Sequence, residues 1–252
     1  MKPVEICLYG DIGNSFWFEG ITANDTRLQL KELDPKADVH TLRINSTGGL
    51  VDEGLAIMNV VRAHKEGMKQ ANPNYKLNTV VDGYCMSAAT LPFMAGDDRK
   101  VALGGVVMIH DAWGYPSGNA AALRKYADDL DNLSENAATI YASLCAPGPV
   151  GEAPRDTKYF RSMMADETYL TGKSVVDCGL ATSLDEALQA TLFAGLTPET
   201  MKGHYVELML KRQERRTFSR ATVAADMLER KKALNTLNML AIELGQPLIT
   251  KS

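Results

Sequence analysis

The sequence predicts an α/β fold in which short, mostly parallel strands alternate with helices. Between residue 4 and about residue 190, apolar runs of strand length are followed in turn by stretches with helical periodicity. The longest such stretch, residues 119–145, keeps the i, i+3, i+4 spacing of an amphipathic helix throughout. Alternation of this kind favours a mostly parallel sheet with right-handed crossovers. The 252 residues suffice for one domain with an appendage.

The elements are expected in the following order. Strands are predicted at VEICLYG (4–10), HTLRIN (40–45), KLNTVVDG (76–83) and GVVMIHDA (105–112). Helices are predicted at residues 23–34, 49–67, 87–96 and 119–145. The Pro- and Gly-rich segment 146–158 predicts an exposed loop, and residues 170–187 predict a closing helix and strand.

The last part of the chain differs in character. Residues 201–252 are helix-prone and carry clustered Lys and Arg, without the interleaved aromatic residues of single-stranded nucleic-acid sites. We therefore predict a domain over residues 1–194 and a helical extension over residues 195–252. The extension is either a solvated appendage or a tail that contacts a partner or another copy.

The composition excludes several classes of function. A net charge of −4 gives no reason to expect nucleic acid or an anionic membrane as the main partner. No apolar run approaches the roughly 20 residues that span a bilayer, and MKPVEICLYGDIG does not resemble a signal peptide, so a cytoplasmic protein is expected. The four cysteines are scattered without metal-ligand spacing, which favours reduced thiols and no metal.

The stretch GYCMSAAT (83–90) places Ser87 where a strand gives way to a helix. A small residue at such a corner commonly serves packing, but a hydroxyl there can also be a nucleophile if a base lies near. Of the four histidines, only His110 ends an apolar run, GGVVMIH. It is therefore expected at the carboxyl end of a buried strand, the edge at which open α/β sheets build their sites.

A glycine turn adds hydrogen-bond donors to this pair. INSTGGLVDEG (44–54) follows a strand and opens a helix, and Gly48 and Gly49 allow backbone conformations that are closed to other residues. Ser87 also begins a predicted helix, so the N–H of Ala88 would point the same way. The two turns can converge so that the N–H groups of Gly49 and Ala88 hold an oxyanion beside Ser87.

Four segments together resemble the ClpP family, the proteolytic subunit of the Clp serine protease. They are INSTGGLVDEGLAI, GYCMSAA, VVMIHDAWG and ETYLTGKSVVDCGLAT, in the family's order and approximate spacing. The resemblance implies a crotonase-like spiral of βαβ units, assembled into a homo-oligomeric ring such as a heptamer or a double ring. It implies a serine peptidase that needs no cofactor.

The resemblance also assigns roles to residues. It makes Ser87 the nucleophile, His110 the general base, and the N–H groups of Gly49 and Ala88 the oxyanion hole. An extended substrate would bind beside residues 48–52, at Gly48 and Leu50. Thr47 departs from the family by replacing the usual proline before the glycines.

The third member of the triad has two candidates. Aligning ETYLTG with the family block places Glu167 where the family usually has Asp. Asp166 would serve if the register slipped by one residue. A Glu can orient a histidine by accepting a hydrogen bond from Nδ1–H, although its extra methylene changes the reach.

Two further segments are similar to the ClpP-like head-maturation proteases of tailed phages and prophages, residues 5–23 and 111–132. The similarity implies a serine endopeptidase that acts on a capsid or scaffold protein in the host cytoplasm. Because only about three residues precede the first strand, we expect it to work without an ATP-driven unfoldase. The alternatives are a non-catalytic ring or scaffold subunit with the same fold, and a crotonase-type enzyme acting on an acyl-coenzyme A.

Overall fold

The computed structural model describes residues 2–14, 19–148 and 154–185. The predicted extension, residues 195–252, and the predicted boundary before it lie outside these ranges. Within them, the structure contains no helix of the length and apolarity that crossing a lipid bilayer requires.

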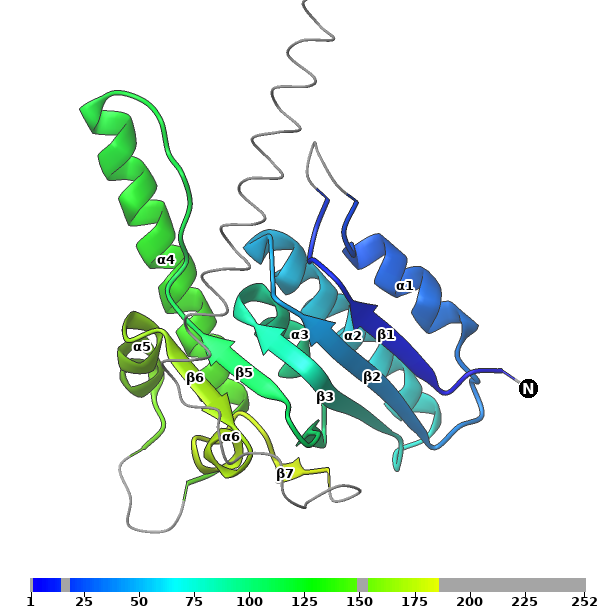
Figure 1. Ribbon diagram of the computed structural model, residues 1–252. Helices are drawn as coiled ribbons and strands as arrows, with labels where there is room; N and C mark the ends of the chain where they lie inside the picture. Colours follow the sequence, from blue (N-terminus) through cyan, green and yellow to red (C-terminus); the bar gives the residue numbers. More distant parts are fainter. Residues whose placement is uncertain (1, 15–18, 149–153, 186–252) are drawn as a thin grey trace, which may run out of the picture. The chain divides into compact units, whose positions relative to one another are not determined.

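The described residues form a mixed α/β fold around one sheet, in which the neighbouring strands of the first half pair in parallel (Figure 1). The predicted strands correspond to β1 (Glu5–Tyr9), β2 (Val39–Ser46), β3 (Lys76–Met86) and β5 (Val106–Ile109). Three shorter strands complete the sheet, β4 (Arg99–Val101), β6 (Thr168–Thr171) and β7 (Ser183–Leu184). The predicted fold class is therefore confirmed.

The sheet divides at β3, and this division places the carboxyl end of β3 next to β5. Residues 79–81 of β3 pair with β4, whereas residues 84–86 pair with β5. On the far side of β5, β6 runs antiparallel and pairs Ile109 with Thr168. The ends of β3 and β5 and the start of β6 consequently lie side by side.

Side-chain caps mark the starts of three helices in the part of the chain that the structure describes. The helices there are α1 (Ala23–Glu32), α2 (Val51–Ala71), α3 (Thr90–Phe93), α4 (Ala120–Leu144), α5 (Thr157–Ala165) and α6 (Lys173–Asp177). Thr22 and Asp25 form a capping box at α1, and the side chains of Asn119 and Asp156 accept N–H groups at the starts of α4 and α5. In Figure 1, α2 and α3 pass behind the strands, while the first half of α4 extends beyond the sheet.

Three sequence expectations differ from the structure. The predicted helix 87–96 is a 3₁₀ turn, η1 (Ser87–Ala89), followed by the four residues of α3. The predicted loop 146–158 already contains the start of α5, because Asp156 caps that helix. The three residues of β4 were not predicted, since a run this short has no periodicity to read.

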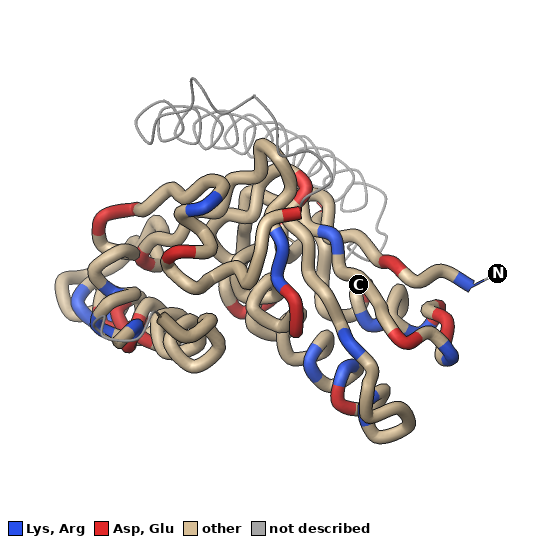
Figure 2. The backbone as a smooth tube through the Cα atoms, turned by 90° about the horizontal axis from the view of Figure 1, so that it is seen from below, with Lys and Arg blue, Asp and Glu red and all other residues tan. Residues whose placement is uncertain are grey.

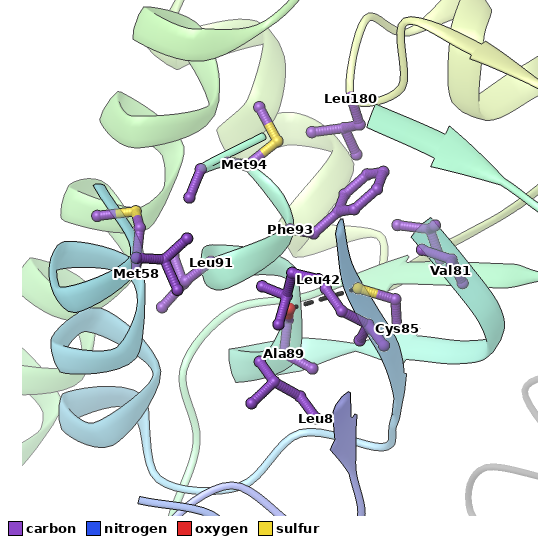
Figure 3. Close-up of a cluster of buried hydrophobic side chains, with 14 of the residues drawn as sticks. Leu8, Leu42, Met58, Val81, Cys85, Ala89, Leu91, Phe93, Met94 and Leu180 are labelled. Carbon is purple, nitrogen blue, oxygen red and sulfur yellow. Dashed lines mark hydrogen bonds between the residues drawn. The ribbon is translucent and has the colours of Figure 1, made fainter. Parts of the chain in front are cut away.

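Buried apolar side chains fix the corner that follows β3 (Figure 3). Leu91, Phe93 and Met94 pack beneath the corner with side chains from the strands, and all three are buried. The Cys85 thiol adds a hydrogen bond, its Sγ lying 3.4 Å from the carbonyl oxygen of Ala89. Close packing on this scale leaves the corner little freedom to move.

Charged residues of both signs are interspersed along the described backbone in the view of Figure 2. Some of their ion pairs are exposed, such as that between Lys173 and Asp177, and others are partly buried, such as that between Lys65 and Asp97. All four cysteines are free thiols, with Cys85 and Cys178 buried and Cys7 exposed.

Candidate active site

Ser87 stands at the corner between β3 and η1 in an unusual backbone conformation. Its φ of +53° lies in the left-handed region, which a residue with a side chain adopts at a cost of about 1–3 kcal/mol. Two hydrogen bonds hold the corner. The hydroxyl of Thr90 lies 2.6 Å from the carbonyl oxygen of Ser87 and 2.6 Å from the hydroxyl of Tyr141 on α4.

His110 is the first residue after β5, and the pairing of β5 with β3 carries it to Ser87. Met86 pairs with Met108, so both chains leave the sheet at the same level. The Nε2 atom of His110 lies 2.7 Å from the Oγ atom of Ser87. When the serine hydroxyl donates this bond, Nε2 accepts it and the ring proton resides on Nδ1.

The surroundings of His110 keep its ring neutral at neutral pH. Burial lowers the pKa of His110 below its ordinary value, and the negative charges of Glu167 and Asp111 oppose this by raising it. The net direction of the pKa is downward. A neutral imidazole is the form that can take a proton from a hydroxyl.

The two acidic candidates lie on different sides of the chain. Asp166 ends α5 as its C-cap and is exposed, and its N–H donates to the carbonyl of Ser162. Glu167 is partly buried, adopts a φ of +50° and accepts a 3.3 Å hydrogen bond from the hydroxyl of Tyr169. Of the two, only Glu167 acts electrostatically on His110. Partial burial and its charge effect on His110 thus distinguish Glu167 from the exposed Asp166.

The glycine turn packs directly against the serine corner. Gly48 and Gly49 have φ values of +89° and +157°. A Cβ added at Gly48 would lie 2.6 Å from the carbonyl oxygen of Met86 and 2.7 Å from the Cβ of Ser87. Any side chain at position 48 would therefore displace the corner that carries Ser87.

The bridge between Ile12 and Gly49 sets the direction of the Gly49 N–H. The N–H of Ile12 donates to the carbonyl of Gly48, and the N–H of Leu50 donates to the carbonyl of Ile12, at 3.0 Å each. In a parallel bridge of this kind the N–H of the central residue, Gly49, points to the opposite side. The N–H of Ala88 belongs to the first turn of η1, where no preceding helical carbonyl is available to it.

The segment expected to hold substrate needs a correction. Residues 51–52 belong to α2, so only residues 48–50 of the expected segment lie outside the helix. The N–H of Leu50 is occupied by Ile12, although its side chain is exposed. Among the described residues, no group of three or more His, Cys, Asp and Glu side chains could hold a metal ion.

Sequence reasoning missed the residues that support this constellation. Thr90 follows Ser87 by three positions, but its partner Tyr141 lies 51 residues further on. Asp111 directly follows His110, and a carboxylate next to a candidate base is a sequence signal that could have pointed to its influence on the base. Its partner Arg161 lies 50 residues away, in a helix whose start was predicted as loop.

A comparison with protein families agrees with this arrangement. A family model described as Clp protease matches residues 4–186, which contain every strand and helix described above. The match covers more than half of the chain, and Ser87, His110 and Glu167 all fall within it. The chain therefore belongs to the Clp protease family, a family of peptidases.

Proposed function

We propose that this protein is a serine endopeptidase in which Ser87, His110 and Glu167 form the triad. The observation that carries the proposal is the 2.7 Å hydrogen bond between Ser87 Oγ and His110 Nε2. A serine hydroxyl is a weak nucleophile until a base within this reach takes its proton. Ser87 is also partly accessible to solvent, as a residue that attacks a substrate must be.

The chemical steps follow from the arrangement. Ser87 Oγ attacks the carbonyl carbon of a peptide bond while its proton passes to His110 Nε2. The resulting imidazolium gives this proton to the leaving amine, and an acyl-enzyme is left on Ser87. A water molecule, deprotonated by the same nitrogen, then attacks the acyl carbon; the bond to Ser87 Oγ breaks, His110 returns the proton to Oγ, and the acid product leaves.

In this proposal, Glu167 is the acid that stabilises the imidazolium form of His110. Its negative charge raises the pKa of His110, and this favours the cation that forms during attack. Asp111 also raises that pKa, but its carboxylate pairs with Arg161. Glu167 is therefore the better candidate to orient Nδ1–H.

The N–H groups of Gly49 and Ala88 are proposed to stabilise the oxyanion. Gly48 lies against Ser87, and a Cβ placed there would be 3.1 Å from the nitrogen of Ala88. The glycine turn and the Ala88 amide thus lie next to each other at the nucleophile. Preorganised donors at that position stabilise negative charge only as it develops.

The substrate is proposed to bind as an extended strand along Gly48 and Leu50, with a capsid or scaffold protein as the natural target. Residues 5–23 and 111–132 support this through their similarity to head-maturation proteases. An exposed, extended segment of a substrate can bind through main-chain hydrogen bonds without prior unfolding, and Gly49 is the residue between Gly48 and Leu50 whose main-chain groups point away from the bridge with Ile12. We therefore propose cleavage without ATP, by a homo-oligomeric ring in the cytoplasm of the host, with residues 1–194 as the protease domain and residues 195–252 as a helical extension.

The proposal is tested by measuring cleavage of an unfolded protein such as casein, together with self-cleavage, without ATP. Ser87→Ala is expected to abolish both activities. Ser143→Ala, which removes an exposed hydroxyl on α4, is the matched control and is expected to leave them unchanged. Cleavage that survives Ser87→Ala contradicts the proposed nucleophile, and stable association with a Clp ATPase in a pull-down contradicts ATP independence.

A further inference from the structure

One peptide carbonyl at the end of α5 joins the two segments that carry the proposed base and acid. The carbonyl of Met164 accepts the N–H of Asp111 at 3.2 Å and the N–H of Glu167 at 3.0 Å. Asp111 follows His110 directly. The position of α5 therefore determines how the segment that follows β5 lies relative to Glu167, the residue directly before β6.

Arg161 lies one turn before Met164 on the same helix and forms a second connection to the same segment. Its guanidinium pairs with the carboxylate of Asp111 through a direct hydrogen bond. The next residue, Ala112, is held from α4, where its N–H donates to the buried hydroxyl of Ser134 at 2.9 Å. The chain leaving His110 is thus fixed on both sides.

The pair with Asp111 is the best shielded of the three ion pairs that Arg161 makes. The Asp131 and Glu135 carboxylates on α4 lie 3.7 and 3.5 Å from the guanidinium, with side chains 80% and 61% exposed. The Asp111 and Arg161 side chains are 38% and 25% exposed. Because solvent and salt screen exposed pairs, the contact with Asp111 is the one that constrains geometry.

We propose that Arg161 is a positioning residue of the active site, which holds α5 against the His110 segment and balances the charge of Asp111. The proposal rests on the serine-protease function proposed above. Arg161 touches no reacting atom. It acts through Asp111, which is adjacent to the base, and through Met164, which is hydrogen-bonded to the residue that carries the acid.

The charge balance has a consequence for His110. The charged groups acting on the imidazole are Glu167 and Asp111, and both raise its pKa against the effect of burial. Removing Arg161 leaves the Asp111 carboxylate uncompensated, which favours the imidazolium further. Removing the Asp111 carboxylate instead removes one of the two negative charges that favour the imidazolium, while Arg161 keeps its contacts with Asp131 and Glu135, and this disfavours the imidazolium. The two changes therefore shift the pH dependence of Ser87 reactivity in opposite directions.

The test measures the rate constant for labelling by a fluorophosphonate probe as a function of pH, which requires no known substrate. Arg161→Gln is expected to lower the plateau rate by roughly tenfold, which is a fraction of what a full 1 Å misplacement costs. It is also expected to move the acid limb of the pH–rate profile, where His110 becomes protonated, to higher pH. Asp111→Asn is expected to move the limb to lower pH. The double variant returns it towards that of the unaltered protein, and Arg161→Lys restores both rate and midpoint.

The controls separate this inference from the proposed function. Lys76→Gln removes a cation from an exposed ion pair at the opposite end of β3 and is expected to change neither rate nor midpoint. If Arg161→Gln and Asp111→Asn leave the midpoint unchanged or shift it in the same direction, the inference is wrong. If Arg161→Gln does not fold, the direction of the Asp111→Asn shift decides. Absence of labelling in the unaltered protein would instead overturn the proposed function.

Discussion

The Oγ atom of Ser87 lies 2.7 Å from the Nε2 atom of His110, although 23 residues separate the two in the chain. The parallel pairing of β3 with β5 brings them together, because each residue directly follows its strand. The buried cluster beneath α3 then keeps the serine corner in place. The central contact of the site is thus a consequence of strand register.

Substitutions at Glu167 and Asp166 should show which of the two carboxylates is the acid of the triad. Glu167→Gln removes the charge that stabilises the His110 cation, and the labelling rate should fall roughly 10²- to 10⁴-fold. Asp166→Asn alters an exposed helix cap and should leave the rate within about twofold. A larger loss from Asp166→Asn than from Glu167→Gln would reverse the assignment.

Gly48→Ala should damage the nucleophile corner. The added Cβ would meet Met86 and Ser87 at a φ of +89°, so we expect a loss of about 1–3 kcal/mol in unfolding free energy. Labelling should fall roughly 100-fold, because Ser87 would be displaced from His110. Chemical denaturation and probe kinetics measure the two effects.

Gly67→Ala is the matched control for that substitution. Gly67 lies within α2, and a Cβ there would contact nothing within 4 Å. The change should stabilise the protein by about 0.5–1 kcal/mol through helix propensity. It should leave labelling unchanged, and equal damage from both variants would contradict the account of Gly48.

Thr90→Val should weaken the corner by removing a shared hydroxyl. Thr90 has one hydroxyl proton, which it donates to the Ser87 carbonyl, so Tyr141 donates to Thr90. The substitution leaves the buried Tyr141 hydroxyl without this acceptor and removes one of the two donors to the Ser87 carbonyl, which still accepts the N–H of residue 90. It should therefore cost about 1–3 kcal/mol of unfolding free energy. Thr139→Val on the exposed face of α4 should change it by no more than about 0.5 kcal/mol. A Thr90→Val variant as stable as the unaltered protein would contradict this role.

A histidine pair near the start of β2, with His40 buried and His64 partly buried, should make stability depend on pH. His40 Nε2 lies 2.9 Å from the carbonyl of Asp34 and therefore carries the proton, which leaves Nδ1 to accept from Tyr75 at 2.8 Å. His64 Nε2 lies 3.4 Å from the same Nδ1. Burial lowers the pKa of both histidines below their ordinary value of 6.5.

The sign of the effect follows from these lowered pKa values. As pH falls through 6.5, the unfolded chain takes up protons that the folded histidines resist, so the unfolding free energy decreases. The decrease ends once the pH is below the folded pKa values. His64→Gln should reduce the loss between about pH 7.5 and about pH 5.5, measured by urea unfolding at fixed protein concentration. An unchanged pH dependence in this variant would contradict the assignment.

Features that local sequence patterns encode could be predicted from the sequence alone. Ser87 and His110 each end an apolar run, and the glycine pair at Gly48 marks a turn, so all three could be placed at one edge of a sheet. The choice between Asp166 and Glu167 could not be made this way. The proposed choice of Glu167 depends on where α5 ends, because Asp166 caps the helix and is exposed while Glu167 is partly buried.

Contacts between segments that lie far apart in the chain could not be predicted from the sequence, for a similar reason. The Arg161–Asp111 pair spans 50 residues and joins a helix to a strand end, with no periodicity that connects them. The three residues of β4, which were not predicted, form a strand because β3 and β7 supply the pairing on either side. Whether so short a segment forms a strand depends on its tertiary contacts.

Peptide mapping of the protein after reaction with a fluorophosphonate probe is the most direct test of the proposed serine chemistry. We predict a single covalent adduct on Ser87, absent in Ser87→Ala and strongly reduced in His110→Ala, because the hydroxyl needs its base. An adduct on another residue, or undiminished labelling of Ser87→Ala, would contradict the proposal that Ser87 is the nucleophile of this peptidase.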